Sequence, residues 1–233
     1  MKKMYYVLCL AILLAIYFTL IFFMNRLKNA KLMNAVFIAL TVVCYTVLVV
    51  YVYLDVGLYD WNFLNVLPTA NVSPFMFFTL ILYAVLPSKK KKHWSILICL
   101  LSLGMLFAAI LGCVTRAATG YKFHFTFVLD YVSHLSLSLL GVYLAKTNQV
   151  ELNKKDCLLS GSLIVIVAVI MLVINLIAGT SFFGLALNEK YNIYNMVLVP
   201  NCYLSALLYF VGLIGVLVLG YFYIKLLTLK RKK

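Results

Sequence analysis

The stretch Trp61–Pro87, WNFLNVLPTANVSPFMFFTLILYAVLP, decides how this chain folds. It is apolar enough to lie in a membrane, but Pro68 and Pro74 exclude one continuous helix, because proline lacks an amide donor and clashes with the preceding turn. The prolines leave room for a helix over 73–87, about 21 Å long at about 1.5 Å per residue. The hydrocarbon core of a membrane is about 30 Å thick. The stretch therefore predicts a short helix preceded by irregular backbone over 67–72.

The start of this short helix also indicates a binding site. Ser73 followed by Pro74 is typical of a helix start, with serine as the N-cap and proline at the first helical position. Free amides at a helix start favour an anionic group, and proline-interrupted segments often mark binding sites in membrane proteins. The alternative is that 68–74 is only an outer loop leading into a short, tilted helix.

The composition makes residues 1–233 a single integral membrane domain. Of these residues 66% are hydrophobic and 11% are charged, and every polar connection is too short to form a separate soluble domain. Such a chain is a polytopic membrane protein. The six cysteines form no CxxC pair and fall mostly inside apolar segments, so we expect no metal site, no cofactor and no disulfide framework.

Seven apolar segments, each bounded by charges or turn residues, predict an all-α bundle of about seven transmembrane helices, the third one broken at Pro68 and Pro74. The segments cover, in order, 4–24, 32–54, the broken segment ending at Pro87, 94–114, 125–145, 157–179 and 197–227. Lysines beside the first segment leave a six-span chain as the alternative.

The basic residues predict the orientation of the bundle. The formal net charge is +14, and most lysines and arginines fall in the connections 25–31, 88–93 and 146–155 and in the tail after 224. Cytoplasmic connections carry such an excess, so we expect a cell-membrane protein with its N-terminus outside and its C-terminus in the cytoplasm. Bases placed beside apolar spans favour membrane lipids as partners and argue against nucleic acid. The oligomeric state is not set by the sequence.

Two ionisable residues lie inside the predicted fifth helix. Asp130 and His134 are four residues apart and therefore share one helix face, with His134 about 13 Å from the helix start. An ionisable residue at membrane depth is costly and indicates function. We expect Asp130 to orient His134, and His134 to act as a general base. The alternative is a polar bridge from His134 that only joins helices.

Further polar residues lie near the same predicted outer side. Thr69 and Ser73 are candidate nucleophiles, and the candidate substrate-binding residues are Asn71, Asn175, Thr180, Asn201 and Trp61. Asn175 and Asn201 also suit plain interhelical hydrogen bonding, and Trp61 also suits an interfacial aromatic belt.

Three pieces of the chain resemble a known family. They are LNVLPTANVSPF at 64–75, VLDYVSHLSLSLLGVYLA at 128–145, and INLIAGTSFFGL at 174–185 followed by VPNCYLSALLYF at 199–210. In this order they resemble the YwaF-type family of bacterial integral membrane proteins. That family is related to a vertebrate transmembrane acyltransferase that remodels ether phospholipids, and more distantly to the androgen-induced-gene hydrolases of fatty-acid esters.

The resemblance implies acyl transfer or ester hydrolysis on a lipid, with His134 as the histidine base of the fifth span. The enzyme branch carries a cysteine or threonine nucleophile near the proline-containing start of an earlier span, where this chain has Ala70. Thr69 or Ser73 would have to replace the cysteine, because a hydroxyl beside a base can attack an ester carbonyl.

The sequence thus favours a lipid acyltransferase or ester hydrolase acting from the outer leaflet. The alternatives are a binding or transport protein for a small molecule or lipid, and a non-catalytic scaffold. A transporter should show polar residues toward both faces, whereas the inner halves of the predicted spans are nearly all aliphatic or aromatic.

Overall fold

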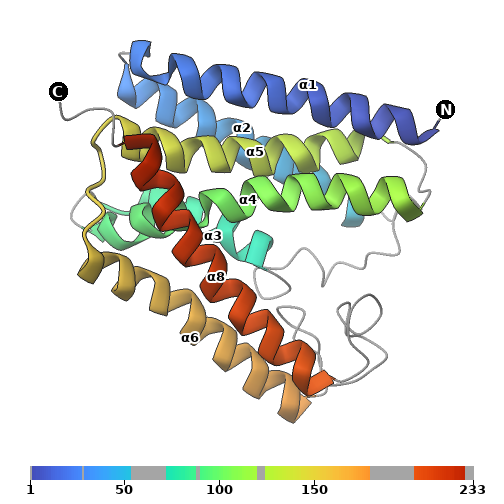
Figure 1. Cartoon of the computed structure of the whole chain (residues 1–233), viewed down its shortest axis with the longest axis vertical. Coiled ribbons are helices and arrows are strands. Elements are labelled where there is room, and N and C mark those ends of the chain that lie inside the picture. The colour runs from blue at the N-terminus through green and yellow to red at the C-terminus, as the bar shows by residue number, and fades with distance from the viewer. Residues whose placement is uncertain are drawn as a thin grey trace.

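The computed structural model describes residues 2–27, 29–53, 72–87, 90–119, 124–178 and 202–228, and all regular structure in these ranges is helical (Figure 1). The elements are α1 (Lys2–Phe23), the short 3-10 turn η1 (Met24–Arg26), α2 (Ala30–Tyr53), α3 (Val72–Val85), α4 (Lys92–Thr119), α5 (Phe125–Lys146), α6 (Lys154–Ala178) and α8 (Cys202–Thr228).

The helices α1, α2, α4, α5, α6 and α8 are each long and apolar enough to cross a membrane, and α3 is a shorter apolar helix. The chain is therefore an all-α polytopic membrane protein, as the sequence predicts. The seven predicted segments correspond to these seven helices, and the third is the short one.

The short third helix has nearly the predicted bounds. It has 14 residues, which gives about 21 Å at about 1.5 Å per residue. It begins at Val72, so Ser73 lies within its first turn, and the prediction of Ser73 as the N-cap is wrong. Pro74 is still within the first turn, where the amide that proline lacks has no intrahelical partner in any case. Of the predicted irregular backbone over 67–72, Val72 is helical, so the prediction is wrong there, and 67–71 lie outside the described residues.

The fourth helix is longer than predicted, since it runs to Thr119 and not to about residue 114. The letters TRAAT at 115–119 contain no helix breaker, and alanine and arginine are strong helix formers. The hydroxyl of Thr115 also bonds back to the carbonyl of Leu111 at 2.8 Å. The predicted segment 94–114 left Arg116 in the connection that follows it, and this is wrong because Arg116 lies inside α4.

The helices α4 and α5 form the centre of the bundle (Figure 1). Helix α2 packs on α5, α1 contacts both α4 and α5, and α6 and α8 pack on the other side of α4. Among the long helices α5 is the most buried and the least apolar, whereas α1 is the most exposed. This order is the one that a membrane imposes, because only a helix surrounded by protein can carry polar side chains at low cost.

Two glycines allow the central helices to approach closely. A Cβ atom on Gly141 of α5 would lie 2.7 Å from the carbonyl oxygen of Ile98 in α4. A Cβ atom on Gly220 of α8 would lie only 1.8 Å from the carbonyl oxygen of Leu100, also in α4. Small residues at helix contacts are the usual way to pack membrane helices. Both neighbours of α4 therefore touch its backbone directly.

Candidate functional site

The start of α5 is fixed by a side-chain cap. The Nδ1 atom of His124 accepts a hydrogen bond from the backbone amide of Thr126 at 3.3 Å, so the helix begins at Phe125. At about 1.5 Å per residue, Asp130 then lies about 7 Å and His134 about 13 Å along the helix. Both side chains are buried, with 8% of each residue exposed.

The structure brings Asp130 and His134 into contact. The Nδ1 atom of His134 lies 3.3 Å from the Oδ1 atom of Asp130 and 2.8 Å from its backbone oxygen. These two oxygens can only accept hydrogen bonds, so the proton of the neutral imidazole lies on Nδ1, where it is shared between them. The lone pair then lies on Nε2. This arrangement fixes the orientation and the tautomer of the imidazole. It is the geometry of an oriented base.

A third ionisable residue, Arg116 of α4, joins this pair. Its Nη1 atom lies 2.8 Å from the Oδ2 atom of Asp130, and only 12% of its side chain is exposed. Its guanidinium group also lies over two α5 rings, 4.7 Å from the centroid of Phe127 and 5.4 Å from that of Tyr131. The carboxylate therefore binds the imidazole with one oxygen and the guanidinium with the other. We call Arg116, Asp130 and His134 the charged triad.

Arg116 is a member of the site that the sequence did not predict, because the predicted apolar segment ends at residue 114. The available signal was the unbroken helical sequence at 115–119, which carries the arginine into a helix. An arginine at that depth needs a carboxylate partner, and Asp130 lies at the matching end of the next helix.

The imidazole of His134 faces α3. Its ring makes an edge-to-face contact with Phe77, with centroids 5.8 Å apart, and Phe77 in turn stacks on Tyr45 of α2 at 3.8 Å. Ser73 precedes Phe77 by four residues, which is about 6 Å along the helix. The first turn of α3 thus lies on the same side of His134 as Asp130 does, since both helices run in the same direction.

The other predicted site residues are not brought to the triad by the described structure. Asn175 is buried in α6, which packs mainly on α4 and α8. The backbone of Ser73 belongs to α3, but its side chain is not described. The remaining predicted site residues lie outside the described residues, and these are Trp61, Thr69, Asn71, Thr180 and Asn201.

The hydroxyls farther along α5 serve to join helices. Ser138 donates to the carbonyl of Ser102 in α4 at 2.6 Å and pairs with the hydroxyl of Tyr17 in α1 at 2.8 Å. Tyr17 also reaches the hydroxyl of Tyr223 in α8 at 3.1 Å. Hydrogen bonds of this kind hold membrane helices together. Joining helices needs only such neutral hydrogen bonds. The ionisable groups of the charged triad are therefore the better candidates for a functional role.

Within the described ranges, no group of three or more His, Cys, Asp or Glu side chains could hold a metal ion.

Searches for similar proteins return no match among family models, curated proteins or solved structures. What the fold and the site define is a class: an all-α polytopic membrane protein with a buried Arg–Asp–His triad between its central helices.

Proposed function

We propose that this chain is a membrane-embedded lipid acyltransferase or ester hydrolase, with His134 as its general base. The observation that carries the proposal is the contact of Nδ1 of His134 with Asp130, which leaves Nε2 as the proton acceptor. Asp130 and His134 are each only 8% exposed, and electrostatic interactions are stronger at such buried positions than in open water.

In the proposed reaction, the hydroxyl of Ser73 or Thr69 attacks the carbonyl carbon of a lipid ester and gives its proton to Nε2 of His134. The ester C–O bond then breaks, and the leaving alcohol takes that proton. Water, or the hydroxyl of a second lipid, attacks the acyl-enzyme by the same route in reverse. The amides at the start of α3, together with Asn71, would bind the negative charge that develops on the carbonyl oxygen.

The proposal includes a side of the membrane. Lysines gather at the end of the bundle that holds the starts of α4 and α6 and the end of α5, which we call the lysine-rich end. By the positive-inside rule, that end faces the cytoplasm and the opposite end faces the outside of the cell. The charged triad lies in the half of α5 that is nearer to its start, so it would then work on lipids of the outer leaflet.

A transport function is less well supported, because the hydroxyls between the triad and the lysine-rich end are engaged. Ser136 pairs with Thr41 of α2 at 2.6 Å, and Ser138 binds both α1 and α4. These bonds hold α1, α2, α4 and α5 together between His134 and the lysine-rich end. They favour a site that is reached from one side.

The experiment that tests the proposal compares lipid extracts of cells that lack the chain, carry it, or carry His134→Gln. We expect a class of lipid ester that changes when the chain is present and does not change with the variant. The matched control is His93→Gln at the lysine-rich end, where the imidazole binds Ser160 at 3.0 Å; this variant should behave like the unchanged protein. Identical lipid profiles for all four strains would overturn the proposal.

A further inference from the structure

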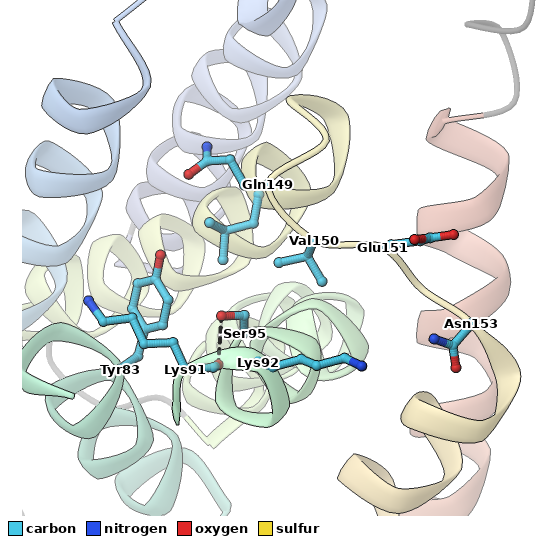
Figure 2. Close-up of a pocket in the computed structure, with 9 residues that line it drawn as sticks. Tyr83, Lys91, Lys92, Ser95, Gln149, Val150, Glu151 and Asn153 are labelled. Carbon is cyan, nitrogen blue, oxygen red and sulfur yellow. Dashed lines mark hydrogen bonds between the residues drawn. The ribbon is translucent and has the colours of Figure 1, made fainter. Parts of the chain in front are cut away.

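A second feature lies at the lysine-rich end, where the end of α3 and the start of α4 meet the loop between α5 and α6. A cavity of about 320 Å³ opens there, within the size range of small-ligand sites (Figure 2). Its walls combine cationic, hydroxyl and aliphatic side chains, and the ones that matter here are Tyr83, Lys91, Lys92, Ser95, Leu144 and Val150.

The positive charge of the cavity comes from Lys91. Its Nζ atom lies 5.1 Å from the ring centroid of Tyr83 and 3.5 Å from the carbonyl oxygen of Ala84, and neither contact neutralises the charge. Lys92 is different, because its Nζ atom lies 2.6 Å from the Oδ2 atom of Asp156. In Figure 2 the two lysines extend to opposite sides, with Ser95 between them.

The frame around Lys91 is held in place. Ser95 donates to the backbone carbonyl of Lys91 at 2.8 Å, which ties the start of α4 together. On the facing wall, Gln149 accepts from Asn34 at 2.6 Å and donates to Thr147 at 2.7 Å. The one carboxylate of the lining, Glu151, lies on the far side and points toward α8 (Figure 2). An anion at Lys91 is therefore not opposed by a neighbouring carboxylate of the lining.

The position of the cavity relative to the membrane indicates what kind of anion it binds. It sits where the apolar helix Pro74–Val85 ends and the apolar span beginning at Lys92 starts, so it lies at the boundary between hydrocarbon and headgroups. Its aliphatic wall, Leu144 and Val150, suits the apolar part of a lipid. We propose that this cavity binds a phosphate group through Lys91, either that of an anionic phospholipid headgroup or a free phosphate.

Titration calorimetry of the full-length protein in detergent tests this inference in two arms, one with short-chain phosphatidylglycerol and one with inorganic phosphate. Lys91→Gln removes the proposed contact. The matched control is Lys90→Gln, which makes the same charge change in the same basic run on an exposed side chain that does not line the cavity. Val150→Phe is a second variant, which fills the cavity and leaves every charge in place.

We expect Lys91→Gln to weaken binding about tenfold or more, as the loss of a charged hydrogen bond does, and Val150→Phe to weaken it as well. Lys90→Gln should weaken binding by no more than about fivefold, which is the typical effect of removing one lysine near a charged surface. An effect confined to the phosphatidylglycerol arm assigns the site to a lipid, and one confined to the phosphate arm assigns it to free phosphate. Equal losses for Lys90→Gln and Lys91→Gln, or no binding in either arm, would overturn the inference.

Discussion

Arg116 is the residue on which the charged triad depends for its stability. Arg116→Met removes the guanidinium group that pairs with Oδ2 of Asp130 and leaves a buried carboxylate without its cation. Breaking a buried ion pair in this way typically costs about 3–5 kcal/mol. We therefore expect a large fall in the thermal unfolding temperature of the purified protein in detergent.

The double variant Arg116→Met with Asp130→Asn serves as the control, because it removes both charges. It should be clearly more stable than Arg116→Met alone, since no unpaired charge remains. If the single and double variants unfold at the same temperature, the ion pair between α4 and α5 is not formed.

At this scale the sequence predicted one contact of the triad and missed the other. The pairing of Asp130 with His134 follows from a spacing of four residues within one helix, and the structure confirms it. The pairing of Asp130 with Arg116 depends on where α4 ends and on how it faces α5. The helix-forming letters at 115–119 indicate that α4 continues through Arg116, but no local pattern shows which face of α4 meets α5.

Among the helices, the close approach of α8 to α4 gives the sharpest test of the packing. Gly220→Ala places a methyl group on the backbone of Leu100, so the two helices must separate, and overpacking of this kind typically costs about 1–3 kcal/mol. Gly212→Ala, on the same helix, meets nothing within 4 Å and is the matched control. The thermal unfolding temperature should fall for Gly220→Ala and stay close to wild type for Gly212→Ala. Equal behaviour of the two variants would contradict the close packing of α4 and α8.

Helix bounds were predictable where a proline, or charges and turn residues at the end of an apolar segment, mark them. Pro74 places the start of α3 within two residues, and the sequence bounds of α5 agree with the structure to about one residue. The end of α4 was not predicted, because the hydropathy falls at Arg116 before the helix does. Hydropathy measures the preference for lipid, whereas helix continuation depends on the backbone and on tertiary partners.

For the whole molecule, the orientation remains a prediction from charge. Tags placed after Lys233 and within 88–93 should be protected from reagents that cannot enter the cell, and a tag within 188–192 should be labelled. Labelling of the tag after Lys233 in intact cells would show that the orientation is opposite to the predicted one. The charged triad would then face the inner leaflet.

The central claim is that His134 is the base of a lipid ester reaction, and the most direct measurement is the turnover of lipid ester by purified protein in vesicles. We predict that His134→Ala stays folded but loses about 10²- to 10⁴-fold in rate, the usual effect of removing a general base. Only one of Ser73→Ala and Thr69→Ala should share this loss, because a single hydroxyl acts as nucleophile. Added imidazole should restore part of the rate to His134→Ala. Turnover by folded His134→Ala at the wild-type rate would contradict the account.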